Sequence, residues 1–463
     1  MAIRCGSKLW ALGLVLLAPR DAAAEPDAPA VERGDQYDLA ARSETYVELF
    51  RRALLPGPSG AIVETGTAAP VHEYLSLSAH DLDTSWRKDA IDVELAAWGR
   101  GWLGDQETER RFDGDVQVAN ARYRHGPLSF RLGRQQAAGG AARWVRFDGA
   151  EVGATLPAGL SLEGYGGFTV LPRWDARPGY HHLGAAADSL LRTPEAVPEP
   201  DRSGYLLGGG KMSWTGDRGH AALSFHEQHE EAGLARRTLG ADARAQIVTS
   251  VGLGGAGLFE LDALGIQDAR LWVDTTPAPP VDLSVEYLHT EPALFLSRQS
   301  VLSVFTTEAY EEIGGNAVVR PVPGLALETG GWLEIYDADR RGARGDLGAR
   351  IQPGAGKRTV VRVGYSRVVA VENGYHGARL ALSHRIALPL TGTVEAYGYL
   401  YDEPILGRTT SSVYAGTLGW QAARAVNLTW GASLAQSPYA SVDLQTLLRL
   451  ILDFDFSRRE LAK

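Results

Sequence analysis

The residues that most resemble a chemical site are the histidines and glutamates of HEQHEE, at positions 226–231. A zinc-protease motif needs two histidines four residues apart on a helix with a glutamate between them, because this spacing turns both imidazoles toward one metal ion. His226 and His229 are only three residues apart and stand at the end of a predicted strand. We therefore expect a solvated strand end here and no metal site.

A second motif lacks residues that calcium binding requires. Asp337, Asp339 and Gly342 have the spacing of a calcium loop. However, Arg341 stands where an oxygen ligand belongs, and Gly348 stands where the closing glutamate belongs. The segment therefore predicts an ordinary polar loop.

The glycine-rich segment GGGK, at 208–211, is followed by methionine and by no helical pattern, so it is not a phosphate loop. Glycines inside a strand instead indicate curvature of a barrel wall. The sequence has no G-x-S-x-G elbow, and a Ser/His/Asp site could be assembled only from different strands. We therefore expect no enzyme, with no catalytic residue, no metal site and no cofactor.

Composition and the first residues restrict the class of protein. The formal net charge is -10, from 46 Lys+Arg and 56 Asp+Glu, which is too acidic for a general nucleic-acid binder. Two basic residues, the apolar run LWALGLVLLA and three alanines predict a signal peptide at residues 1–24, with a mature protein from Glu25. The single cysteine, Cys5, would be removed with it, which leaves no disulfide.

Strict alternation of apolar and polar residues is the main signal from about residue 70 onward. In VNLTWGASLAQ, at 426–436, every second residue from Val426 to Leu434 is apolar, as in a half-buried strand. Many such strands carry charged residues on the polar face, which a soluble core would bury at high cost. We expect these residues to line a pore: Arg131, Glu163, Asp282, Glu286, Arg362, Arg379, Arg385, Glu395 and Asp453.

A lipid bilayer is the simplest cover for so many apolar strand faces. No apolar run of about 18 residues follows the signal, so the chain would cross the bilayer with strands and not with a helix. Short Gly/Pro turns alternate with longer polar loops, such as 171–204, as at the two ends of an outer-membrane barrel. The spacing predicts an all-β transmembrane antiparallel barrel of roughly 18–22 strands over residues 61–463, in which 232–266 forms a hairpin or one long loop.

Two segments are expected to differ from this pattern. YVELFRRALLPG places Val47, Phe50 and Leu54 at helical spacing and ends at Pro56, so residues 25–60 predict a segment with a short helix. This segment could be a periplasmic extension or could lie in the lumen. The loop 293–310 is apolar enough either to fold over or into the barrel mouth or to pack on neighbouring loops.

Two stretches resemble known families. RLILDFDF, at 449–456, resembles the C-terminal strand that the barrel-assembly machinery recognises, although seven residues follow Phe456. FRLGRQ, at 130–135, with RFDGAEV, at 146–152, resembles a strand pair of alginate-export-type porins. The shared residues are Gly133, Arg134, Gln135, Asp148, Gly149 and Ala150. The resemblance implies the barrel architecture, while the mixed charges do not imply an alginate channel.

These patterns predict a porin-like channel in the outer membrane of a Gram-negative bacterium, for passive diffusion of small hydrophilic solutes. Expected partners are membrane lipid, lipopolysaccharide, the assembly machinery and small solutes, with no nucleic acid. The alternatives are a structural barrel, a hydrolase with its site at the barrel rim, and a soluble secreted β-protein. Charges of both signs in the lumen predict weak ion selectivity, with a mild preference for cations. The solute, the oligomeric state and whether the pore is open are not predicted.

Overall fold

The computed structural model describes residues 38–54, 63–64, 69–83, 89–103, 112–170, 204–230, 233–291, 309–336, 340–354, 356, 358–370, 373–438 and 440–456. The predicted signal peptide, most of the loops 171–204 and 293–310, and the calcium-like residues Asp337 and Asp339 lie outside these ranges. None of the helices in the described ranges is long and apolar enough to span a bilayer.

The first half of the chain forms twelve strands. They are β1 (Asp38–Leu54), β2 (Val63–Glu64), β3 (Pro70–Asp83), β4 (Asp89–Trp102), β5 (Phe112–His125), β6 (Leu128–Ala138), β7 (Trp144–Leu156), β8 (Leu160–Thr169), β9 (Leu206–Gly216), β10 (Gly219–Glu230), β11 (Gly233–Val248) and β12 (Val251–Glu260). Two one-turn 3-10 helices connect them, η1 (Gly140–Ala142) and η2 (Pro157–Gly159). The segment 232–266 is therefore a hairpin, β11–β12, and not a long loop.

The second half adds eleven more strands. They are β13 (Gly265–Ala278), β14 (Val281–Thr290), β15 (Tyr310–Val322), β16 (Leu325–Tyr336), β17 (Arg341–Ile351), β18 (Thr359–Val369), β19 (Tyr375–Ala387), β20 (Leu390–Ile405), β21 (Arg408–Ala423), β22 (Val426–Gln436) and β23 (Ala440–Asp455). Each pairs with its neighbours in antiparallel register.

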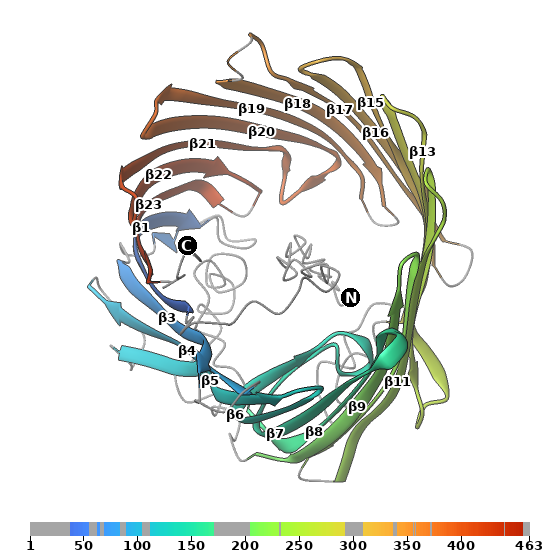
Figure 1. The fold of residues 1–463 in the computed structure, drawn as a ribbon. Helices are drawn as coiled ribbons and strands as arrows, with labels where there is room; N and C mark the ends of the chain where they lie inside the picture. The colour runs from blue at the N-terminus through green and yellow to red at the C-terminus, as the bar shows by residue number, and fades with distance from the viewer. Residues whose placement is uncertain are drawn as a thin grey trace.

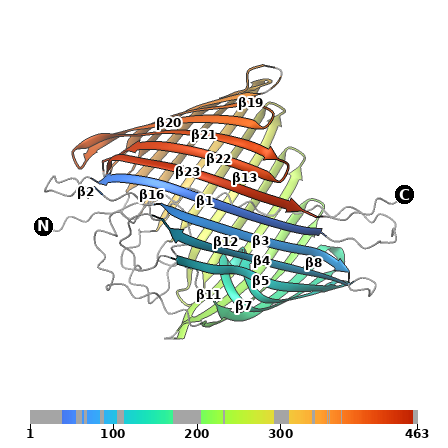
Figure 2. The same ribbon diagram turned by 90° about the vertical axis from the view of Figure 1, so that its left-hand side faces the viewer.

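The sheet closes on itself because the first and last strands pair. β1 pairs with β23 from Ala40↔Asp455 to Leu54↔Ala440, and with β3 on its other edge. Apart from the two-residue β2, which extends only the end of β1, 22 of the 23 described strands form the wall. Figure 1 shows the ring viewed down its axis and Figure 2 the tilted strands from the side. The count lies at the upper end of the predicted range.

The helix predicted in residues 25–60 is wrong, because residues 38–54 form strand β1. Ser43, Thr45 and Val47 lie on one face, and Glu44 and Tyr46 on the other, so a period of two governs the segment. Its neighbours β3 and β23 have unpaired edges that this strand satisfies, which outweighs the helical spacing of three apolar residues. The barrel therefore begins before residue 61.

The two ends of the barrel differ as predicted. The end that holds the start of β1 and the end of β23 carries short Gly/Pro turns, including Gly126 and Gly159, whose φ angles are +54° and +76°. Positive φ favours glycine, because a Cβ atom clashes there. β8 and β9 meet at the opposite end, where the segment 171–204 joins them. Turns at one end and loops at the other match outer-membrane barrels.

The two faces of the wall have opposite character. One face carries large apolar side chains that are solvent-exposed, such as Leu132 (57%), Leu347 (60%) and Val394 (61%). The other face, which holds η1 in Figure 1, carries charged and polar side chains. An apolar surface all round a closed barrel is stable against hydrocarbon and unstable in water. The wall therefore spans a bilayer, with the polar face toward the lumen.

Candidate functional site in the barrel lumen

The strand register places all nine predicted pore-lining residues on the lumenal face. Five of the nine are ion-paired across neighbouring strands, in four pairs: Arg131 with Glu151 (3.4 Å), Glu286 with Arg270 (2.6 Å), Arg379 with Glu395 (3.6 Å) and Asp453 with Arg42 (3.7 Å). Asp282 pairs with Arg320, and Glu163 lies directly opposite Lys211. The charges that the sequence mixes along the chain are thus mostly neutralised locally. Their part in permeation stays a prediction.

Arg362 and Arg385 are the exceptions among the nine. In the described part of the chain, neither lies within 4 Å of a carboxylate oxygen. Arg362 is the direct cross-strand partner of a further arginine, Arg350, and both side chains are exposed. The described carboxylates therefore do not neutralise these guanidinium groups.

One hairpin leaves the wall and folds into the lumen. The β6–β7 connection, with η1 at its tip, lies against the inner face of β10 and β11 (Figure 1). The backbone N–H of Ala141 donates to the Ser224 hydroxyl at 2.7 Å, and the Thr238 hydroxyl donates to the Ala141 carbonyl at 2.8 Å. This contact gives the η1 backbone partners that a lumen-exposed loop would find only in water.

A row of glycines allows the hairpin to bend. Gly133, Gly149 and Gly167 are direct partners across β6, β7 and β8. A Cβ atom would lie 2.3 Å from a backbone oxygen at Gly133, 2.2 Å at Gly149 and 2.3 Å at Gly167. No side chain fits at these distances, so the close approach of the strands requires glycine. The residues quoted for the alginate-type resemblance include two of these three.

Beyond the glycine row the hairpin has a small core of its own. Gln135 and Phe147 are 1% and 0% exposed, and Phe147 packs 5.5 Å from the ring of Tyr165. The ion pair Arg146–Asp115, at 3.1 Å, is almost fully buried, with side chains 4% and 6% exposed. The inward hairpin is therefore a packed structural element that takes up lumen space beside β9–β12.

Arg143, directly after η1, ties the tip of the hairpin to strand β13. Its guanidinium lies 3.5 Å from the Asp268 carboxylate. Burial lowers the pKa of Arg143 to about 10, while the negative charge of Asp268 opposes that shift. The side chain stays charged at neutral pH and adds a third anchor to the two hydrogen bonds.

The histidines of HEQHEE do not meet. His226 is fully buried, with its Nδ1 3.0 Å from the Tyr165 hydroxyl, so it is not the solvated strand end that the sequence predicts. His229 instead contacts Glu227 at 2.8 Å. No group of three or more metal-ligating side chains occurs in the described ranges. The sequence does not reveal this burial, because the inward hairpin that covers His226 comes from another part of the chain.

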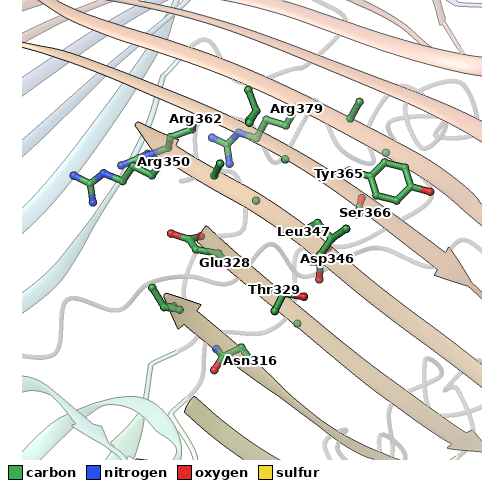
Figure 3. Close-up of a pocket in the computed structure, with 18 of the residues that line it drawn as sticks. Asn316, Glu328, Thr329, Asp346, Leu347, Arg350, Arg362, Tyr365, Ser366 and Arg379 are labelled. Atoms are coloured by element: carbon green, nitrogen blue, oxygen red, sulfur yellow. The ribbon is translucent and has the colours of Figure 1, made fainter. Parts of the chain in front are cut away.

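A hollow in the opposite wall brings together residues that the sequence does not single out. Strands β17 and β18 pair Asp346 with Ser366, Gly348 with Gly364, and Arg350 with Arg362 in three successive lumenal rows. These residues line a pocket of about 660 Å³ that extends over β15–β20. Figure 3 shows the Arg350 and Arg362 side chains extending in the same direction beside Glu328. Alternation in GDLGAR, at 345–350, could have identified Arg350.

Some aromatic residues of the strands face the lumen, and others face outward. Trp332 stacks under the Arg344 guanidinium, 4.3 Å from its ring centre, and Tyr399 packs edge-on against Tyr375 at 5.6 Å. Trp214 and Trp420 do face outward, 45% and 47% exposed. Aromatic type alone does not distinguish a girdle from a lumenal cluster, since strands favour aromatics on either face.

Comparisons with known proteins add little to this architecture. No family model matches the chain, and no curated protein matches it. The translocation pore of the P pilus usher PapC is 10% identical, with a TM-score of 0.44 over 90% of this chain and 99% of that one. Acinetobacter baumannii OccAB4 is 9% identical (TM-score 0.44, 91% and 99% covered), and Pseudomonas aeruginosa OccK5 is 10% identical (0.41, 90% and 98%).

Scores this low carry no argument about relationship, so the assignment depends on the wall itself. A single chain with an even number of antiparallel strands, closed without an edge, is the form of bacterial outer-membrane barrels. Short turns at one end and an apolar outer face accompany it here. The described strands form a closed antiparallel β-barrel with an apolar outer face, which is the architecture of transmembrane barrels.

Proposed function

We propose that the protein is a porin-like channel for passive diffusion of small hydrophilic solutes. The observation that supports this most is the lumenal face, which is charged or polar on strands all round the barrel while the outer face is apolar. Water and small solutes need such a face along their path.

The charges of the lumen suggest how solutes would be selected. Most lumenal carboxylates and guanidinium groups pair with a partner at 2.6–3.7 Å, which leaves little net field along the wall. Selectivity between simple ions should then be weak. The net charge of -10 suggests a mild preference for cations at the mouths.

The inward β6–β7 hairpin supplies the narrowing that a 22-stranded barrel needs. Barrels of 16–18 strands leave an aqueous channel, whereas 22-stranded ones usually hold a plug. The hairpin lies on one side of the ring, against β10 and β11 (Figure 1). We propose that it reduces the bore without closing it.

The alternative is a plugged barrel with a structural role, which the count of 22 strands favours. A rim hydrolase that depends on His226 has less support, because that imidazole is buried against Tyr165. We also propose that the protein is not an enzyme. Hydrolysis of ester and peptide probes is the measurement that would detect such an activity.

The proposed partners follow from the same surfaces. Membrane lipid and lipopolysaccharide would cover the exposed leucines and valines of the outer face. The barrel-assembly machinery would recognise β23, where the Phe454 and Phe456 rings stack at 6.1 Å and the Phe456 N–H donates to the Leu39 carbonyl at 2.8 Å. Deletion of residues 449–456 should therefore abolish insertion.

Single-channel conductance of the detergent-folded protein in a planar lipid bilayer tests the proposal. Discrete steps that persist at low voltage, with a reversal potential near zero in a salt gradient, are expected from an open and weakly selective pore. Insertion without conductance, shown by protease protection of the same vesicles, would establish the plugged alternative.

A further inference from the structure

We propose that the hollow of β17 and β18 is a binding subsite for the phosphate monoester of a small polyol, such as a sugar phosphate. The inference deepens the proposed channel function and rests on it for its physiological role. The binding itself can be measured without any current through the pore.

The first observation is the electrostatic repulsion between two neighbouring arginines, which does not stabilise the fold. Arg350 and Arg362 face each other directly across β17 and β18. Like charges at directly opposite positions destabilise a sheet. Within the part of the chain that the structure describes, no carboxylate oxygen lies within 4 Å of either guanidinium, although Glu328 lies on the next strand. An anion held between them would turn the repulsion into two favourable contacts.

The geometry of the pair favours phosphate over a carboxylate. One guanidinium satisfies both oxygens of a carboxylate in a bidentate contact, so a second arginine would add little. A phosphate monoester has three terminal oxygens and up to two negative charges, which match two forked donors side by side. Both side chains extend in the same direction in Figure 3, as a shared oxyanion requires.

The second observation is that the floor of the hollow, meaning the row of β17 and β18 next to the arginines, consists of glycines. Gly348 and Gly364 form the next lumenal row. A Cβ atom would meet its nearest neighbours at 3.5 Å at Gly348 and at 3.8 Å at Gly364, both ordinary contacts. The backbone therefore does not require glycine here, unlike at Gly149, although glycine weakens a strand. What glycine does provide is a stretch of wall next to the arginines with no side chain of its own, bordered by Glu328 and Arg379, along which the body of a solute can lie.

The third row completes the site. Asp346 and Ser366 lie four residues along their strands from the arginines, roughly 13 Å away at about 3.3 Å per residue. Carboxylate and hydroxyl oxygens accept hydrogen bonds from the hydroxyl groups of a polyol. The negative charge of Asp346 also disfavours an anion at this end. The three rows therefore orient the solute, with the phosphate on the arginines and the hydroxyl groups toward Asp346.

Equilibrium binding to the detergent-folded full chain, measured by titration calorimetry, tests the assignment. The probes are glucose 6-phosphate, glucose and inorganic phosphate. We expect glucose 6-phosphate to bind about tenfold more tightly than inorganic phosphate, and glucose not to bind measurably. Equal binding of the two phosphates, or binding of glucose alone, would overturn the polyol phosphate as the ligand.

Two variants locate the site. The double variant R350Q/R362Q should weaken glucose 6-phosphate binding about tenfold or more, and G348L should do the same by filling the floor. Arg385→Gln is the matched control, since Arg385 is another lumenal arginine without a carboxylate partner in the described ranges and lies outside the hollow. Unchanged affinity in R350Q/R362Q, with the control also unchanged, contradicts the assignment. Resistance to unfolding on unheated gels verifies that each variant is folded.

Failure of this proposal and failure of the channel function are separable. Wild-type protein that conducts ions but binds no glucose 6-phosphate would overturn the subsite and leave the channel intact. Wild-type protein that binds it through Arg350 and Arg362 but never conducts would support the subsite and overturn passive diffusion.

Discussion

Glycine has opposite uses in the two walls of this barrel. In β6–β8, Gly133, Gly149 and Gly167 allow backbones to approach so closely that no Cβ atom fits. In β17–β18, Gly348 and Gly364 have room for a side chain and leave the lumen open instead. The first wall continues into the inward hairpin, whereas the second lines the hollow. Glycine is therefore required by the backbone in the first wall and is not required by it in the second.

The largest effect should come from the buried ion pair of the bent wall. Asp115→Asn removes the carboxylate charge that lies 3.1 Å from the Arg146 guanidinium, which is 4% exposed, and should destabilise the barrel by about 3–5 kcal/mol. The measurement is urea unfolding in phospholipid vesicles. Asp402→Asn, at the more exposed Arg367–Asp402 pair, is the control and should cost about 1 kcal/mol or less. Similar losses in both variants would contradict the contrast in burial.

The glycines themselves test the comparison most directly. Gly149→Ala should destabilise the fold by about 1–3 kcal/mol, because its Cβ would lie 2.2 Å from the Gly166 carbonyl oxygen. Gly348→Ala should change stability by at most about 0.5 kcal/mol, as an unobstructed surface substitution does. Unfolding midpoints of the two variants measure the difference. Equal midpoints would show that the bent wall can relax.

Docking of the inward hairpin should have an intermediate effect. Thr238→Val removes the hydroxyl that donates to the Ala141 carbonyl and should cost about 1 kcal/mol. If the hairpin narrows the pore, the variant should also show larger or noisier single-channel currents than wild type. Thr417→Val, on the lumenal face of the distant strand β21, is a control that should leave the current unchanged. A single-channel current in Thr238→Val with the same size and noise as in wild type would show that the hairpin does not narrow the pore.

The smallest predicted effect has the opposite sign. Arg362→Gln relieves the repulsion with Arg350 and should stabilise the barrel by about 0.2–1 kcal/mol. Arg131→Gln, which breaks a pair with Glu151 at 3.4 Å, should not stabilise it. Thermal unfolding of both variants provides the measurement. A loss of stability in Arg362→Gln would mean that the arginine has a structural partner.

Alternation along each strand predicted the barrel wall and the lumenal position of residues such as Arg362 and Glu395, and Gly/Pro turns predicted the two unlike ends. These features depend on local sequence, since the side-chain period of a strand is two. The helix predicted in residues 25–60 was wrong because the spacing of three apolar residues carries no information about the edges of β3 and β23, with which residues 38–54 pair. The hollow and the buried His226 depend on register between distant segments. No local pattern encodes that register.

The seam between β1 and β23 has a consequence for biogenesis. Residues near 45 and near 450 must find each other before the ring closes, so the contact with the longest sequence separation is also the one that completes the fold. Until β23 emerges and inserts, β1 presents an open edge that could pair with any exposed strand. The protein is thus most vulnerable to aggregation while its last strand is still missing. A factor that holds β1 until β23 arrives would shorten that interval.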